Sequence, residues 1–211
     1  MFLESYSAGP VATNIILLAC EKTKKAAIID APMEGGELVL KRVEELGFEV
    51  VMLIMTHSHW DHIIDAHLLK EKTGAPLYIH ERDKENLLKP GSDGLPLPLP
   101  IEGVEADHLM KEGDVLKVGE LELEVIETPG HTPGGVCLYL PKEGTLISGD
   151  TLFQGSIGRL DLPTAEPDKM WTSLGKLAKL PLDTRVIPGH GSETTIGSES
   201  WLADAKTYFG G

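Results

Sequence analysis

The sequence has little cysteine and no long apolar run, and both absences narrow the kind of protein it can be. Its only cysteines are Cys20 and Cys137, and each lies in an apolar segment typical of a strand. We therefore expect two core thiols rather than a disulfide, which fits a reducing cytoplasm. No segment approaches the roughly 20 apolar residues that a membrane-spanning helix needs. Residues 1–4 lack the basic start of a signal peptide. We expect a cytoplasmic protein with no membrane partner.

Basic residues are scarce relative to acidic ones. The chain carries 19 lysines and arginines against 33 aspartates and glutamates, which gives a formal net charge of −14. Such a surface repels phosphate backbones, so we expect no nucleic-acid partner. An anionic substrate would need positive charge placed locally, on a metal ion or a side chain. No linker or low-complexity tract divides the 211 residues, so we expect one domain over residues 1–211.

The most informative stretch directly follows the apolar segment 50–55. That segment predicts a buried strand, because it is short, partly β-branched and free of charge. After it come three histidines and one aspartate, namely His57, His59, Asp61 and His62. In an extended chain His57 and His59 point to the same side and can bind one ion. Imidazole and carboxylate suit zinc and neighbouring transition metals. We interpret the stretch as a metal site rather than a solvated loop.

The rest of the chain alternates between strand and helix patterns in two halves. Residues 1–30 predict strands, with apolar runs at 14–20 and 26–29, and further strands are expected at 76–80, 115–118, 121–125, 136–140, 145–148 and 185–187. Helices are expected at 36–46, 61–72, 81–88, 167–180 and 199–208. These elements predict an α/β fold, a four-layer αββα sandwich with two mixed sheets flanked by helices. We expect the ligand-bearing segments to converge on one edge, where strands end.

Three other features have open or minor interpretations. Residues 89–100 contain four prolines and predict a rigid extended loop, either a mobile surface loop or a lid beside the site. His67 and His80 have no ligand-like neighbours, and we interpret them as surface or packing histidines. Asp30 ends a strand, where it is either structural or a support for the metal ligands.

Four motifs in this order resemble the metallo-β-lactamase superfamily over nearly the whole chain. They are H-x-H-x-D-H at 57–62, Pro-Gly-His-Thr-Pro-Gly around His131, Ser-Gly before Asp150 and Pro-Gly-His-Gly around His190. The resemblance implies the αββα fold and two divalent metal ions. It assigns one ion to His57, His59 and His131, and the other to Asp61, His62 and His190, with Asp150 bridging them. Zinc is the expected metal, and iron or manganese are alternatives.

Two cations about 3.5–4 Å apart can turn a bridging water into a hydroxide nucleophile near neutral pH. Asp61 can both ligate and orient that hydroxide, so we expect it to be the catalytic carboxylate. A thiolate needs no dedicated acid to leave, because the pKa of a thiol is about 8.5. A thioester is therefore a suitable substrate for such a site.

The run 149–159, Gly-Asp-Thr-Leu-Phe-Gln-Gly-Ser-Ile-Gly-Arg, resembles the glyoxalase II group, the hydroxyacylglutathione hydrolases. The resemblance implies a thioesterase for S-lactoylglutathione, a small-molecule glutathione thioester that Arg159 would contact. A loop-fixing salt bridge is the alternative role for Arg159. The chain departs from the full-length enzymes in two ways: Asp161 replaces the usual tyrosine, and no helical domain follows His190. It is more similar to compact bacterial glyoxalase-II-like hydrolases.

Other functions remain open at this point. A mononuclear iron persulfide dioxygenase would need only His57, His131 and Asp150, and hydrolysis of another ester or a lactone would use the complete set. A β-lactamase is less expected without a signal peptide, and RNA-processing relatives carry added modules. A non-catalytic metal-binding module fits poorly with every ligand position filled. The natural substrate and the oligomeric state are not predicted.

Overall fold

Two six-stranded sheets face each other in the computed structural model, which describes residues 1–210. The N-terminal sheet has the order β1 (Phe2–Ala8), β2 (Thr13–Cys20), β3 (Lys25–Ile29), β4 (Glu49–Ile54), β5 (Leu77–His80) and β6 (His108–Met110). The C-terminal sheet has the order β14 (Thr194–Thr195), β13 (Arg185–Pro188), β10 (Thr145–Gly149), β9 (Val136–Leu140), β8 (Leu121–Glu127) and β7 (Val115–Val118). Each sheet contains parallel and antiparallel pairs. The expected mixed sheets are confirmed.

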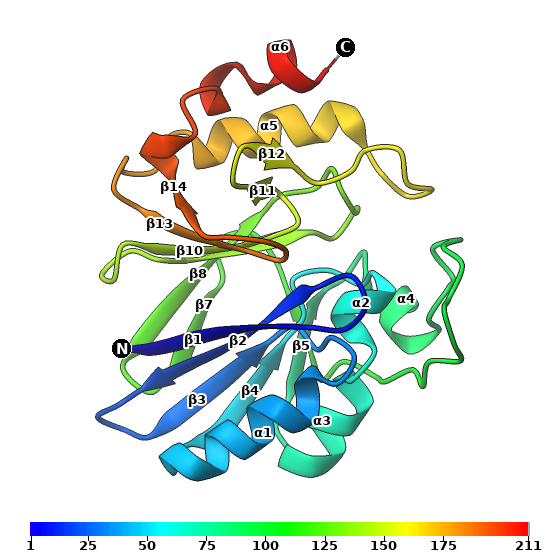
Figure 1. The fold of residues 1–211 in the computed structure, drawn as a ribbon, viewed down its shortest axis with the longest axis vertical. Coiled ribbons are helices and arrows are strands. Elements are labelled where there is room, and N and C mark those ends of the chain that lie inside the picture. The colour runs from blue at the N-terminus through cyan, green and yellow to red at the C-terminus, as the bar shows by residue number, and fades with distance from the viewer. Residues whose placement is uncertain (211) are drawn as a thin grey trace.

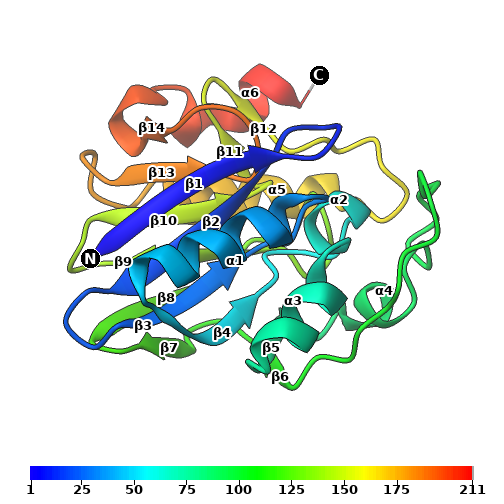
Figure 2. The same ribbon diagram turned by 60° about the horizontal axis from the view of Figure 1, so that its bottom comes forward.

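Helices cover the outer face of each sheet (Figure 1). Helices α1 (Gly35–Leu46) and α3 (Ala66–Thr73) lie on the N-terminal sheet, α5 (Pro167–Leu177) lies on the C-terminal sheet, and α6 (Ala205–Phe209) packs against α5. Figure 2 shows α1 in front of the N-terminal sheet, roughly aligned with its strands. The short helices α2 (Trp60–Ile63) and α4 (Lys84–Leu88) stand at one end of the sandwich. The four-layer αββα arrangement is therefore confirmed.

Alternation along the strands divides the apolar side chains between separate cores. In β2, Ile15 and Leu17 pack with Val39 of α1, whereas Ile16 and Leu18 pack between the two sheets. Successive strand residues point to opposite faces, and β2 is buried on both. A third core lies between the C-terminal sheet and α5. In the outer hairpin β7–β8 buried and exposed residues alternate, as its sequence predicts.

The helix expected at 61–72 is wrong as one element, because it is interrupted between α2 and α3. The loop after β3 takes over two hydrogen bonds that a continuous helix would use. The Ala31 N–H donates to the His62 carbonyl at 2.8 Å, and the Asp65 N–H donates to the Ala31 carbonyl at 2.9 Å. The interruption leaves Asp61 and His62 in a single short turn of helix at the edge of the sheet.

The helix expected at 199–208 is also wrong over its first half. Two 3-10 turns, Ile196–Ser198 and Leu202–Asp204, precede the five-residue α6. The buried Glu199 carboxylate accepts bonds from the Gly155 N–H and the Trp201 indole, which fix it outside a regular helix. The helix expected at 167–180 ends earlier, at Leu177. The short strands β6, β14, β11 (Leu152–Phe153) and β12 (Ser156–Ile157) were not expected.

Cys20 and Cys137 are both buried and form no disulfide, as expected. Among residues 1–210, none of the helices has the length and apolar character that crossing a bilayer requires.

Candidate metal centre

Four chain segments bring the predicted ligands to one edge of the sandwich. They follow β4, β8, β10 and β13, each where its strand ends. Backbone bonds connect these segments, both between the two sheets and within the C-terminal sheet. The Val136 N–H donates to the Thr56 carbonyl at 3.0 Å, and the Gly189 N–H donates to the Gly149 carbonyl at 2.8 Å. The convergence expected from the sequence is therefore present in the fold.

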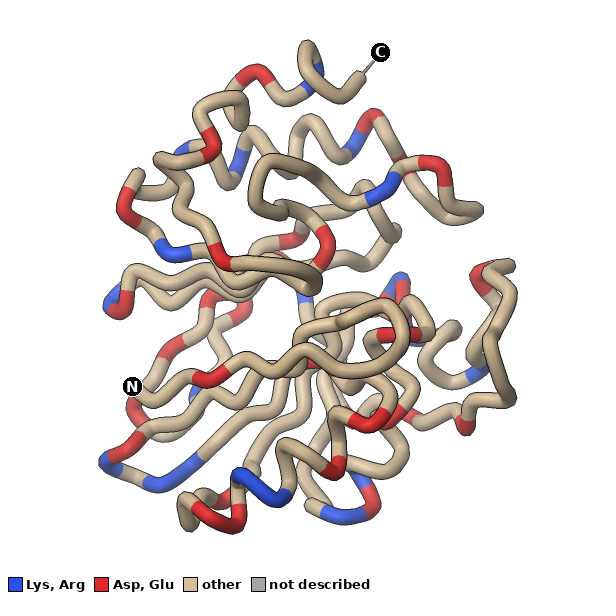
Figure 3. Tube along the Cα trace, viewed as in Figure 1, with Lys and Arg blue, Asp and Glu red and all other residues tan. Residues whose placement is uncertain are grey.

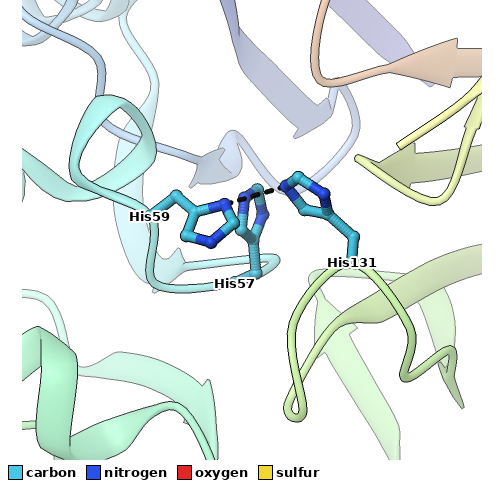
Figure 4. Close-up of side chains that lie close together, drawn as sticks. All are labelled: His57, His59 and His131. Atoms are coloured by element: carbon cyan, nitrogen blue, oxygen red, sulfur yellow. Dashed lines mark hydrogen bonds between the residues drawn. The ribbon is translucent and has the colours of Figure 1, made fainter. Parts of the chain in front are cut away.

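His57, His59 and His131 form a first group of possible ligands, which we call the first site (Figure 4). All three side chains are buried, and His59 Nδ1 lies 2.8 Å from His131 Nε2. Within residues 1–210, His57 Nε2 has no hydrogen-bond partner. Burial and the neighbouring histidines hold the pKa of His57 well below its ordinary value and lower that of His59 to about 3. Neutral imidazoles with free lone pairs are the form that binds a metal ion.

Asp61, His62 and His190 form a second group, the second site. Asp61 Oδ2 lies 3.2 Å from His190 Nε2 and 3.5 Å from His62 Nε2. The Thr13 hydroxyl donates to the same carboxylate oxygen at 2.8 Å. Burial tends to raise the pKa of Asp61, but His62 and the bonds from His190 and Thr13 bring it below its ordinary value. The group thus offers one carboxylate and two imidazoles to a cation.

Asp150 lies between the two sites. Its Oδ2 is 3.3 Å from His131 Nε2, and its Oδ1 is 3.4 Å from His62 Nε2. Close packing explains the glycine before His190, since a Cβ at Gly189 would lie 2.2 Å from Asp150 Oδ1. The position of Asp150 is the one that a bridging ligand would need.

The other ring nitrogen of several histidines faces an oxygen atom. His62 Nδ1 is 2.8 Å from Asp30 Oδ2, and His131 Nδ1 is 2.9 Å from the Arg159 carbonyl. His190 Nδ1 is 3.1 Å from the Val11 carbonyl. Because such an oxygen accepts the ring proton, Nε2 is left free to bind a metal. Asp30 therefore contacts a predicted ligand and supports it.

Carboxylates surround His62. Burial alone would lower the pKa of His62, but Asp150, Asp30 and Asp61 outweigh it and raise that pKa to about 10. A metal ion binds the neutral form of the ring, so ion binding at His62 is expected to depend on pH.

A cavity of about 340 Å³ opens onto both sites. Its walls include the apolar side chains Val11, Trp60, Leu95, Pro96 and Leu162. Leu95 and Pro96 belong to the proline-rich segment 89–100, which lies beside the 158–166 segment in both views (Figures 1 and 2). The structure therefore places segment 89–100 next to the candidate site, where two of its residues form a wall.

Arg159 also lines this cavity, but its guanidinium is paired with Asp161. Arg159 Nε and Nη2 donate to the two Asp161 carboxylate oxygens at 2.9 and 2.8 Å. Both side chains are about 70% exposed. The loop salt bridge is therefore present, and a contact between Arg159 and a substrate would have to compete with it.

His67 and His80 lie outside the site, as we interpreted them. His67 pairs with Glu102 and His80 with Glu127. Asp83 was not predicted from the sequence, although its carboxylate contacts two of the ligand-bearing loops. An aspartate just before a helix is a common cap, so its sequence context carried no signal of this contact.

Known proteins share this fold. The family model described as the Metallo-beta-lactamase superfamily matches residues 8–190. The hydroxyacylglutathione hydrolase GloC of Haemophilus influenzae is 37% identical, over 86% of this chain and 87% of its own. The crystal structure of the BLEG-1 B3 metallo-β-lactamase has a TM-score of 0.87 at 33% identity, covering 94% of this chain and 96% of that one. A protein solved in a di-iron-bound form has a TM-score of 0.79 at 33% identity, covering 93% and 96%.

Proposed function

This chain belongs to the metallo-β-lactamase superfamily, and we propose that it is a dinuclear metal-dependent hydrolase of thioesters of the hydroxyacylglutathione type. One observation carries the proposal: histidine and aspartate side chains from four segments form adjoining groups that open onto one cavity. The similarity to the hydroxyacylglutathione hydrolase of Haemophilus influenzae supports the thioester.

The donor set fits two divalent ions. We propose His57, His59 and His131 as ligands of one ion, and Asp61, His62 and His190 as ligands of the other, with Asp150 bridging. Zinc suits these donors, and iron or manganese do so as well. A relative solved in a di-iron-bound form supports keeping iron among the candidates. Bound there, two such ions would activate a water as nucleophile and polarise the substrate carbonyl.

The side chains of the cavity have separate proposed roles. Asp61 lines the cavity, and the Thr13 hydroxyl holds one of its carboxylate oxygens. We therefore propose that Asp61 orients the nucleophile. Leu95, Pro96 and Leu162 form an apolar wall on one side of the cavity. They would exclude water there and contact the acyl or the thiol part of the substrate. The thiolate leaves without a proton donor, because the pKa of a thiol is about 8.5.

A glutathione thioester is an anionic small molecule, and this chain is acidic. Acidic positions occur throughout both halves of the trace (Figure 3). The metal ions and Arg159 would supply the local positive charge, and Arg159 is our proposed contact for the glutathione moiety. A nucleic-acid partner fits this charge poorly. The free, buried cysteines support the proposal of a reducing, cytoplasmic location.

The test is hydrolysis of S-lactoylglutathione by the purified protein, with bound metals counted on the same sample. We expect turnover with about two ions per chain. The matched variant is Asp61→Asn, for which we expect a loss of turnover while the chain stays folded. No turnover by a protein that holds two ions would refute the thioesterase proposal.

Hydrolysis of a β-lactam is the second candidate function, because the BLEG-1 B3 metallo-β-lactamase is 33% identical and has a TM-score of 0.87. A chromogenic cephalosporin measured on the same sample separates the two activities. If the sample contains a single iron and consumes oxygen with a glutathione persulfide, the persulfide dioxygenase alternative replaces both.

A further inference from the structure

Asp83 connects two loops through one buried carboxylate. The residue immediately precedes α4 and is 2% exposed. Its Oδ2 accepts the Ser58 N–H at 2.9 Å, and its Oδ1 accepts the Gly134 N–H at 2.6 Å. An aspartate at this place usually caps its own helix, but the Asp83 side chain makes no capping bond. Both oxygens are therefore available to the loops.

The two loops are the ones that carry the ligands of the first site. Ser58 lies between His57 and His59, and Gly134 lies three residues after His131. The loops come from different sheets, since one follows β4 and the other follows β8. Asp83 thus fixes the backbone of one loop relative to that of the other, close in sequence to the three histidines of the first site.

Gly134 is matched to this carboxylate. A Cβ at position 134 would lie 2.5 Å from Asp83 Oδ1 and 2.7 Å from its Cγ, closer than side-chain atoms pack. A side chain there would have to displace the carboxylate. Glycine is needed at this position because the Asp83 side chain approaches the backbone so closely.

The carbonyl of Ser58 is held by a residue of α4, the helix that Asp83 precedes. Asn86 Nδ2 donates to the Ser58 carbonyl at 2.6 Å, and Asn86 is 6% exposed. The side chains of Asp83 and Asn86 therefore hold Ser58 by its N–H and by its carbonyl. A segment held in this way has little freedom to change the direction of the flanking imidazoles.

The second site has different supports. The Thr13 hydroxyl holds Asp61, and Asp30 holds the ring of His62. Asp83 makes neither of these contacts. A perturbation of Asp83 should therefore act on one site more than on the other.

We propose that Asp83 is a positioning residue that preorganises the first site by holding the 57–59 and 131–134 segments at a fixed separation. The inference rests on the proposed metal site. A metal ion can bind the three histidines tightly if the two loops move little when it binds. The hydrogen bonds from the outer carboxylate of Asp83 restrict that movement.

The experiment titrates the metal-free protein with Zn²⁺ in competition with a chromophoric chelator. His131→Ala and His190→Ala assign the binding steps, because each removes one ligand from one site. In Asp83→Asn the amide cannot accept both N–H groups, and we expect the first-site affinity to fall about tenfold or more, as for other outer partners of ligands. The second-site affinity should change little. Gly134→Ala should weaken the same step, and the double variant should lose less than the sum of the two.

Asp65→Asn is the matched control. The partly buried Asp65 carboxylate also accepts a backbone N–H, that of Gly36 at 2.9 Å, away from the first site. It should leave both affinities unchanged.

Two results would overturn the inference: a folded Asp83→Asn with both affinities intact, or an equal loss at both sites. If Asp83→Asn does not fold, an unchanged first step in Gly134→Ala overturns it. A wild-type chain that binds no zinc overturns the metal site and this inference together. Two bound ions without thioester turnover would refute only the thioesterase function.

Discussion

Replacing Asp30 by asparagine should weaken the second site through the proton of one imidazole. Asp30 directly follows β3 and has a left-handed conformation, with φ of 61°, which asparagine tolerates well. Its Oδ1 accepts the Thr56 N–H at 2.7 Å, and its Oδ2 is 2.8 Å from His62 Nδ1. The substitution removes one charge and one acceptor and leaves the backbone geometry in place.

The amide oxygen of the variant should keep the bond from Thr56, because the backbone N–H there can only donate. The amide NH₂ then faces His62 Nδ1, where two donors cannot meet. The imidazole can accept this new hydrogen bond only if its proton moves to Nε2. A protonated Nε2 cannot bind a metal ion.

Loss of an outer partner of this kind costs about 10- to 100-fold in metal affinity, or about 1.4 to 2.8 kcal/mol. We expect that loss at the second site in Asp30→Asn. The bond from Thr56 to the retained oxygen should preserve the fold.

The assay is the Zn²⁺ competition titration of the metal-free protein, with circular dichroism to verify the fold. Wild type and Asp30→Asn are compared at the same pH, about 7.5, where the affinity of the chelator for Zn²⁺ is known. An unchanged second-site affinity in a folded variant would show that Asp30 does not set the proton position on His62, and the reasoning would be wrong.

Three further predictions use the same preparations. Asp150→Ala should lower the metal content of both sites, because Asp150 contacts a histidine of each, whereas His67→Ala should leave it unchanged; an unaltered metal count in Asp150→Ala would refute the bridging role. Asp161→Asn should free Arg159 and lower the KM for S-lactoylglutathione by up to about fivefold, the most that an exposed ion pair is usually worth, while the KM for an uncharged thioester stays the same. Removal of metal by a chelator should lower the melting temperature. An ion present at 100 times its Kd stabilises the folded chain by about 2.7 kcal/mol, which corresponds to roughly 5–11 °C per site for a chain of this size. An identical melting curve would mean that no metal was bound to the folded protein.

The longer strands, most helices and the set of metal-type residues could be predicted from the sequence. Apolar runs such as 14–20 and 50–55 are local patterns whose burial does not depend on details elsewhere. The ligand-type residues stand at strand ends, where parallel and mixed sheets collect side chains at one edge. For that reason the grouping of His57 with His59 followed from spacing alone, and the place of His131, Asp150 and His190 followed from the resemblance to a family.

Only the tertiary structure decided what depends on contacts between distant segments. Ala31 interrupts the helix expected at 61–72 by taking two of its hydrogen bonds. Asp83 faces Ser58 and Gly134 instead of capping α4. Segment 89–100 supplies a wall of the cavity, whereas its sequence left open whether it lies beside the site. In each case the local sequence allows several partners for a polar group or a loop, and the partner is chosen by which segments the packed sheets bring within hydrogen-bond distance.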